Sequence, residues 1–317
     1  MDNKHESRIF DGNEVFIIPK CSWSDLGIGD SNEIHPVFKV NGKELEYIAI
    51  GRFQASLSKD DKALSVKDVF PKTNININEA IQYCKNTGDG WHVITRLEWC
   101  AISNWCAMNG FIPCGVTDNI TCNKTGVGDS TYSHNHNTDG VYDMCGNVCE
   151  WNTGIRLYKG ELQVISKDGK FNNDAADINT DISDNSPYWW AIDGTTGELI
   201  RPNNIGTTVN SIKISSKGWI TSSDSSDYYR NGYDAIYCYD KICRKAKDIL
   251  LSLGLLKSPY IQYDTNHNMY LFKSNDISMY AGGSFKSKNK DGMFTLSGAP
   301  ATSKLDNVGF RIAFIKI

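Results

Sequence analysis

The sequence lacks the short patterns by which common enzyme and metal-site families are identified. None of its ten cysteines forms a CxxC pair, which argues against zinc-ribbon and thioredoxin-like sites. There is no GxxxxGKS/T, no GxGxxG after a strand, no GxSxG and no HExxH. Nucleotide-binding loops, serine-hydrolase elbows and zinc-protease helices therefore have no candidate residues here.

Long apolar runs, excess charge and linker composition are also missing. No run reaches the about 18 apolar residues that suggest a membrane-spanning helix. A net charge of −4 argues against a nucleic-acid binder that neutralises phosphates. Residues 1–8 are polar and charged, so we expect no signal peptide and interpret most cysteines as reduced core residues. Without a linker or an internal repeat, we expect a flexible segment at 1–13 and one elaborated domain at 14–317.

Capping patterns predict two helices. The Asn-Ile-Asn-Glu stretch at 76–79 precedes a helical pattern over 80–86, and the Thr-Arg-Leu-Glu stretch at 95–98 starts a helix that ends at Gly110. In each stretch the first side chain can accept from the amide three residues on, while the glutamate carboxylate can return to the first amide. Both helix starts are therefore specified locally.

A third helix and several short strands follow from periodicity. Apolar residues at helical spacing predict a helix over 240–253. Alternation of β-branched and aromatic residues predicts strands at 15–18, 46–52, 161–165 and 309–315. Long stretches rich in Gly, Asn, Asp and Ser separate them, which a compact domain seldom carries unless the loops have a function.

Residues 139–151, Asp-Gly-Val-Tyr-Asp-Met-Cys-Gly-Asn-Val-Cys-Glu-Trp, contain oxygen ligands at regular intervals. The carboxylates of Asp143 and Glu150 flank the carbonyls of Gly146 and Val148. Such a set can surround one hard cation, most plausibly calcium, with one or two further oxygens or waters. The alternative interpretation is a tight turn in which Glu150 accepts from backbone amides.

A second informative segment lies near the end of the sequence. The pair Gly282-Gly283 allows close approach of backbones, and a polar, lysine-rich stretch follows it before Gly309-Phe310-Arg311. Polar residues between core-type residues are typical of an adaptable surface on a rigid scaffold. An ordinary solvated loop before a terminal strand is the alternative interpretation.

Taken together, these segments resemble a known family. Residues 139–151 are similar to the signature of the formylglycine-generating-enzyme/sulfatase-modifying-factor domain, and 282–284 and 309–311 match its closing motifs. The pattern is closer to one subset, the variable proteins of diversity-generating retroelements and related phage tail or host-recognition proteins. The resemblance covers nearly the whole chain. It implies an α+β, C-type-lectin-like fold with few helices, short strands and much irregular loop.

The resemblance also implies a metal site and the loss of a catalytic one. It assigns a structural calcium ion to Asp143, Gly146, Val148 and Glu150. The oxidase members of the family hold copper with a cysteine pair after Gly-Gly-Ser, but residues 285–291 contain no cysteine. We therefore expect no enzyme activity. A copper-dependent oxidase would have to use distant cysteines, such as Cys145 with Cys149 or Cys238 with Cys243.

In variable proteins, the stretch between Gly-Gly and Gly-Phe-Arg is the diversified ligand surface, which here falls within residues 282–311. The residues that we expect to contact the ligand on this surface are Ser284, Phe285, Lys286, Ser287, Lys288, Asn289, Lys290, Thr295, Ser297, Thr302 and Lys304. The sequence departs from the family at Phe285, where tryptophan is common, and in the dominance of lysine. The lysines suggest an acidic ligand.

The function that follows is ligand binding without catalysis. We expect a phage or prophage receptor-binding protein, or a retroelement-diversified variable protein, that displays residues 284–304 to a surface protein or glycan. Its place would be a virion or the surface of a host cell, without nucleic acid or membrane insertion, and with a homo-oligomer as an open alternative. A structural virion component, in a tail or as capsid decoration, is the main competing hypothesis.

Overall fold

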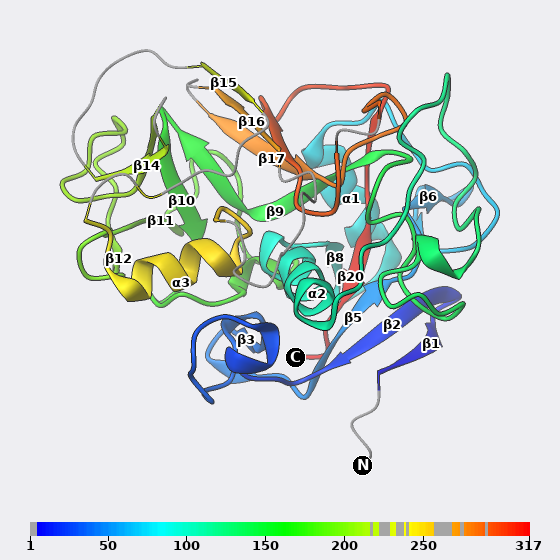
Figure 1. Cartoon of the computed structure of the whole chain (residues 1–317), viewed down its shortest axis with the longest axis horizontal. Coiled ribbons are helices and arrows are strands. Elements are labelled where there is room, and N and C mark those ends of the chain that lie inside the picture. The colour runs from blue at the N-terminus through cyan, green and yellow to red at the C-terminus, as the bar shows by residue number, and fades with distance from the viewer. Residues whose placement is uncertain are drawn as a thin grey trace.

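The computed structural model describes residues 5–215, 218–221, 229–232, 238, 241–256, 268–272, 276–288 and 291–317. These residues form three α-helices and many short strands in mixed and antiparallel sheets, joined by long loops (Figure 1). This composition agrees with the predicted α+β class. No helix among the described residues combines the length and the apolar character needed to cross a membrane.

The smaller of the two main sheets brings both ends of the chain together (Figure 1). Its strands run in the order β1-β2-β5-β20-β8, and every neighbouring pair is antiparallel. The strands are β1 (Glu6–Phe10), β2 (Asn13–Pro19), β5 (Tyr47–Gly51), β20 (Ile312–Phe314) and β8 (Trp91–Val93). Strand β1 lies within the segment predicted to be flexible. It is ordered by its hairpin with β2, in which Ile9 pairs with Glu14 and Ser7 with Phe16.

The larger sheet is organised around one long strand, β9 (Cys149–Tyr158). On one side β9 pairs with β10 (Glu161–Ile165), which continues to β11 (Trp189–Ile192) and β12 (Leu199–Ile200). On the other side β9 pairs with β17 (Ile277–Ala281), and the first residues of β9 also pair in parallel with β19 (Val308–Phe310) on the side opposite β17. Beyond β17 the order is β18 (Leu296–Ala299), β16 (Met269–Phe272) and β15 (Tyr229–Gly232). Strands β13 (Lys213–Ser215) and β14 (Gly218–Ile220) branch from β10.

Two small hairpins complete the strands. They are β3 (Lys39–Val40) with β4 (Lys43–Glu44), and β6 (Ser56–Leu57) with β7 (Ala63–Leu64). Short 3-10 helices punctuate the loops: η1 (Ser24–Leu26), η2 (Pro36–Phe38), η3 (Ser130–Tyr132) and η4 (Asp174–Ala176).

The single strand predicted over 309–315 is in fact two strands that belong to different sheets. Strand β19 pairs with β9 of the large sheet, and β20 pairs with β5 and β8 of the small sheet. Arg311 is the residue between them. The alternation of apolar residues continues across Arg311, so the sequence gives no sign that the chain changes partners there.

Both predicted capping boxes are confirmed. In α1 (Ile77–Thr87), the Glu79 amide donates to Asn76 Oδ1 at 2.9 Å and the Asn76 amide donates to Glu79 Oε2 at 3.0 Å. In α2 (Arg96–Asn109), Thr95 and Glu98 exchange the same bonds at 3.1 and 2.9 Å. Helix α2 lies near the centre of the molecule, and most of its surface is buried (Figure 1).

The third helix begins later than predicted. Helix α3 (Arg244–Ser252) has Cys243 as its N-cap, with Sγ accepting from the Ala246 amide at 3.4 Å. Buried Ile242 supplied the earlier part of the apolar pattern, but it precedes the helix. All ten cysteines are free thiols, and five of them are buried in the core.

Candidate functional site

The predicted ligand surface falls on the loop between β17 and β18, on β18 itself at Ser297, and on the segment that follows β18. The structure exposes Lys286, Lys288, Thr302 and Lys304 and leaves Ser287 and Ser297 half-buried. Asn289 and Lys290 lie outside the described residues. Ser284, Phe285 and Thr295 are only 2, 5 and 2% exposed, so these three side chains are not part of the exposed surface of the loop.

Each of the three buried residues holds the loop instead. The Phe285 amide donates to Asn147 O at 2.9 Å, and its ring is buried because a phenyl group gains free energy by leaving water. Ser284 Oγ accepts from Asn307 Nδ2 at 3.0 Å. Thr295 Oγ1 accepts from the Gly292 amide at 2.9 Å. The polar character of the sequence therefore overestimated how many residues of this loop are exposed to solvent.

The loop is bonded directly to the other informative motif, at 139–151. The Gly146 amide donates to Gly282 O at 2.7 Å, and Phe285 reaches the carbonyl of Asn147 as described above. Lys288 adopts a left-handed conformation with φ of 52°, and its amide donates to Thr117 O at 2.6 Å. The backbone of the loop is therefore fixed by main-chain bonds to its neighbours.

Asp291 organises the side chains of the loop, although the sequence did not mark it as a site residue. One carboxylate oxygen accepts from Ser287 Oγ. The other lies 3.4 Å from Tyr270 Oη and 3.5 Å from Thr295 Oγ1. Gly283 permits this arrangement, because its φ is 69° and a Cβ there would lie 2.4 Å from Asp291 Cβ. An acidic residue within a lysine-rich stretch was the available sequence signal.

The lysines of the surface are largely paired with acids. Lys286 Nζ lies 2.6 Å from Asp306 Oδ2, and Lys304 Nζ lies 2.6 Å from Glu79 Oε1. All four side chains are a third or more exposed, so the pairs are solvated and weak. They nevertheless cancel much of the positive charge from which an acidic ligand was inferred.

Two cysteines named for the oxidase alternative lie directly beneath this loop. Cys145 Sγ is 3.6 Å from Asp291 O, and burial raises the pKa of the Cys145 thiol to about 12. Burial also raises the pKa of Cys149, which lies beside Ser284. Both groups therefore remain protonated near neutral pH, whereas nucleophilic and metal-binding cysteines act as thiolates.

A fully buried ion pair supports the motif and the loop from below. Arg311 Nε and Nη2 donate to the two oxygens of Glu150 at 2.9 and 2.7 Å, and both side chains are 0% exposed. Arg311 also donates to Gly51 O and Tyr142 O at 2.9 and 2.8 Å. The guanidinium thus ties β5, the 139–151 motif and β9 together at the point where the chain changes sheets.

Three of the four oxygen groups assigned to calcium, Gly146 O, Val148 O and the Glu150 carboxylate, converge on a side-chain amide. Gln54 Nε2 lies 2.7 Å from Val148 O, 2.9 Å from Glu150 Oε1, 3.2 Å from Asp143 O and 3.4 Å from Gly146 O. Asp143 contributes its main-chain carbonyl, and its carboxylate instead accepts from the Gly126 amide at 2.9 Å. Gln54 is itself 0% exposed.

The orientation of the Gln54 amide follows from a chain of bonds that ends on a backbone donor. The Asn123 amide donates to Asn147 Oδ1 at 2.8 Å, so Asn147 Nδ2 is the end that donates to Gln54 Oε1 at 2.8 Å. The remaining end of Gln54 must be its NH₂ group, which faces the four oxygens.

Calcium requires six to eight oxygens at about 2.3–2.6 Å, and here a nitrogen stands among the assigned oxygens. The residues as placed do not fit the expected ion. No cluster of three or more His, Cys, Asp or Glu within the described part of the chain could hold a metal either.

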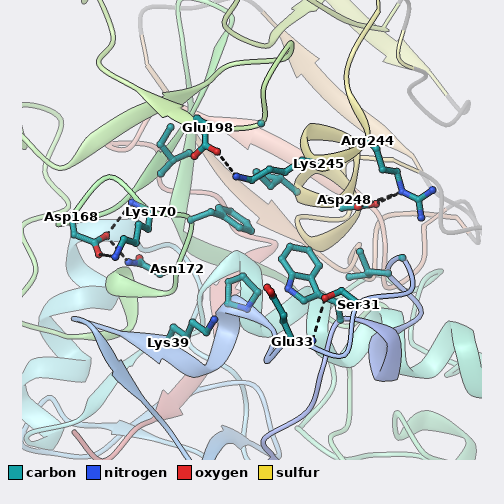
Figure 2. Close-up of a pocket in the computed structure, with 18 of the residues that line it drawn as sticks. Ser31, Glu33, Lys39, Asp168, Lys170, Asn172, Glu198, Arg244, Lys245 and Asp248 are labelled. Carbon is teal, nitrogen blue, oxygen red and sulfur yellow. Dashed lines mark hydrogen bonds and ion pairs between the residues drawn. The ribbon is translucent and has the colours of Figure 1, made fainter.

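A large hollow, which the sequence did not indicate, lies where η1, η2 and β3 face α3 and the turn before β12 (Figure 2). Its volume is about 820 Å³, within the range of small-molecule sites. Trp23 and Phe171 contribute half-buried aromatic rings. Around them Figure 2 shows the ion pairs Lys245–Glu198, Arg244–Asp248 and Lys170–Asp168.

Comparisons with known proteins give only loose structural similarity. No model of a known protein family matches the sequence, and no curated protein matches it. The structure is similar to that of Treponema denticola variable protein 1, with 11% identity over 98% of this chain and 99% of that chain, at a TM-score of 0.37. It is also similar to PvdO from Pseudomonas aeruginosa, with 12% identity over 99% and 100% of the two chains, at a TM-score of 0.31.

Proposed function

We propose that this protein binds a surface ligand without catalysis, through the exposed side chains of the β17–β18 loop and of the segment after β18. The observation that carries the proposal is the contrast between a fixed loop backbone and exposed side chains, two of which are held only by solvated, weak ion pairs. Main-chain bonds to Asn147, Thr117 and Gly146 hold the backbone. Lys286, Lys288, Thr302 and Lys304 extend from it into solvent.

Such an arrangement suits recognition because the side chains can vary while the scaffold is preserved. A preorganised backbone reduces the entropy that must be lost on binding. The resemblance of residues 139–151 and 282–311 to variable proteins and phage host-recognition proteins supports the same assignment. We therefore place its action at a virion or cell surface, with a protein or glycan as partner.

The oxidase alternative is less well supported by the local chemistry. Cys145 and Cys149 lie under the loop, but they are buried and their pKa values are raised by burial. An assay of copper-dependent oxygen consumption with a cysteine-containing peptide separates the two functions. Turnover of the peptide would contradict the proposal of binding without catalysis.

The direct test is binding of the fluorescently labelled protein to intact bacterial cells and to arrayed bacterial surface polysaccharides. We expect the combined substitutions Lys286→Ala, Lys288→Ala and Thr302→Ala to abolish binding while the melting temperature stays nearly unchanged. Lys167→Ala is the matched control, because Lys167 also forms a partly exposed ion pair, 3.1 Å from Asp177, but not in this loop. Binding that survives the triple substitution would contradict the proposal.

The genomic context separates the possible origins of such a binder. A near-copy of the codons for residues 282–311, differing only at adenines and adjacent to a reverse transcriptase gene, would establish a diversified variable protein. Its absence would favour a fixed phage adhesin. A protein that binds none of the surfaces but assembles with tail or capsid proteins would favour the structural virion component.

A further inference from the structure

We propose that the hollow between Trp23, Phe171 and α3 is a second binding site, and that it takes a neutral sugar in pyranose form. The elements that line it lie at the lower left of Figure 1, apart from the β17–β18 region at the top. The proposal is therefore independent of the function proposed for the loop.

The walls of the hollow come from segments that are far apart in the sequence but packed firmly together. Gly197, before β12, approaches α3 so closely that a Cβ would lie 2.6 Å from Lys245 Cγ and 2.9 Å from the Ala246 nitrogen. Trp23 packs edge-on against the buried ring of His35, with centroids 4.7 Å apart. The hollow is thus bounded by ordered structure and not by a single loose loop.

The interior offers apolar and aromatic surface. Trp23 and Phe171 are half-buried, and Pro36, Ile28, Leu199 and Ile249 line the hollow as buried residues. A ligand with an apolar face would gain free energy by covering the two exposed ring surfaces. A ligand without an apolar face would not gain this free energy.

The charges around this interior do not favour an ion of either sign. Six acidic and five basic side chains line the hollow, so it presents almost no net field. Three of the basic groups already pair with acids: Lys245 with Glu198 at 2.5 Å, Arg244 with Asp248 at 3.1 Å and Lys170 with Asp168 at 3.7 Å. A phosphate or a carboxylate would meet as many repelling groups as attracting ones.

Glu33 and Lys39 are two further polar residues of the lining. They lie along the lower side of the hollow in Figure 2, opposite Glu198 and Lys245. Within the described part of the chain, neither the Glu33 carboxylate nor the Lys39 ammonium has a hydrogen bond or ion pair. One can only accept and the other can only donate.

A ligand that satisfies both kinds of group must donate and accept along its edge while presenting an apolar face. Each sugar hydroxyl is both a donor and an acceptor, so it can bond to a carboxylate or an ammonium without displacing an ion pair. The C–H face of a pyranose ring supplies the apolar surface for Trp23 and Phe171. A neutral pyranose, alone or as a unit of a short glycan, therefore fits the hollow.

Saturation-transfer NMR on the whole protein tests this directly. The probes are the methyl glycosides of glucose, galactose, mannose and N-acetylglucosamine at millimolar concentration, with glucuronic acid and a methyl sialoside as charged comparisons. We expect transfer to the ring C–H protons of at least one neutral glycoside. We expect Trp23→Ala and Phe171→Ala to weaken its binding by about tenfold or more, as loss of a buried anchor does at other binding sites.

Glu33→Gln and Lys39→Met change only the polar side of the hollow, and each should weaken binding severalfold. They keep the test decisive if Trp23→Ala does not fold. The control is Trp105→Ala, at a half-buried tryptophan outside the hollow, which should bind as the wild type does. Three results would overturn the proposal: no transfer to any neutral glycoside, transfer that persists in the Trp23 and Phe171 variants, or preference for a charged glycoside.

Discussion

Arg311 and Lys286 both pair with a carboxylate, but the two pairs lie in opposite environments. The Arg311–Glu150 pair is 0% exposed on both sides, whereas Lys286 and Asp306 are 49 and 61% exposed. The buried pair belongs to a frame formed by Gln54, Glu150 and Arg311, in which every charge has several partners. The exposed pair belongs to the proposed ligand surface.

This difference distinguishes charged residues that stabilise the fold from charged residues that are exposed and available to a ligand. A buried charge cannot lose its partner without a large cost, because no water replaces it. A solvated charge can be exchanged for another side chain at almost no cost. If the β17–β18 loop is a surface for recognition, substitutions should divide into these two groups.

The largest effect is expected at Arg311. The substitution Arg311→Met leaves the Glu150 carboxylate buried without its cation and should lower the free energy of unfolding by about 3–5 kcal/mol. Urea unfolding monitored by circular dichroism measures this loss. The double substitution Arg311→Met with Glu150→Gln should recover part of it. A loss below about 1 kcal/mol would mean that the pair is not the support described above.

The substitution of Gln54 should have the second-largest effect on the free energy of unfolding. Gln54→Ala removes the side-chain amide that donates to Val148 O and Glu150 Oε1. Glu150 Oε1 keeps its bond from Arg311 Nη2, but Val148 O loses the Gln54 donor, and leaving a buried acceptor without a donor costs about 1–3 kcal/mol. Because the amide stands where the cation would be, the melting temperature of the wild type should be the same in EDTA and in millimolar calcium. Gln54→Ala, which opens space among the four oxygens, is the variant that should gain stability from calcium. A wild-type melting temperature that rises with calcium would contradict this account of Gln54.

Acidification should affect the frame through His134. Burial lowers the pKa of His134 to about 3, and Arg311 is one of the charges that add to the shift. Its ring accepts from the Val141 amide at 2.8 Å, a bond that requires the neutral form. Because the pKa is near 6.5 when unfolded, the contribution of His134 is complete above pH 6.5. It should fall by about 1.4 kcal/mol per pH unit as the pH drops from 6.5 toward 3.

The measurement must isolate His134 from groups that act in the opposite direction. Burial raises the pKa values of Asp143 and Asp276 to about 6. The contribution of these two carboxyls to the free energy of unfolding therefore increases as the pH falls from 6 toward 4. The quantity to compare is therefore the difference in unfolding free energy between the wild type and His134→Gln at pH 8, 6.5 and 5. That difference should shrink below pH 6.5, and a constant difference would show that His134 titrates normally.

The frame and the surface also differ in how far the sequence predicted them. Local signals sufficed for the capping boxes at Asn76 and Thr95, because both partners of each bond lie within four residues. No local signal could place Gln54 among oxygens that follow it by 89–96 positions. For the surface, Lys286 and Lys288 are exposed, but the equally polar Ser284 and Thr295 are buried. Inside a loop there is no period of 2 or 3.6 to separate inward from outward positions.

The smallest effects on the free energy of unfolding are expected for the exposed ion pair of the ligand surface. A small effect is the result that supports a surface whose side chains can vary. Lys286→Ala and Asp306→Ala should each change the free energy of unfolding by no more than about 0.5 kcal/mol, and the coupling energy from their double-mutant cycle should be equally small. Urea unfolding of the two single variants and the double variant provides the three values required. A coupling above about 1 kcal/mol would show that the pair helps to fold the loop, as the Arg311–Glu150 pair does for the frame. The surface would then be constrained by the structure and not free to vary with the ligand.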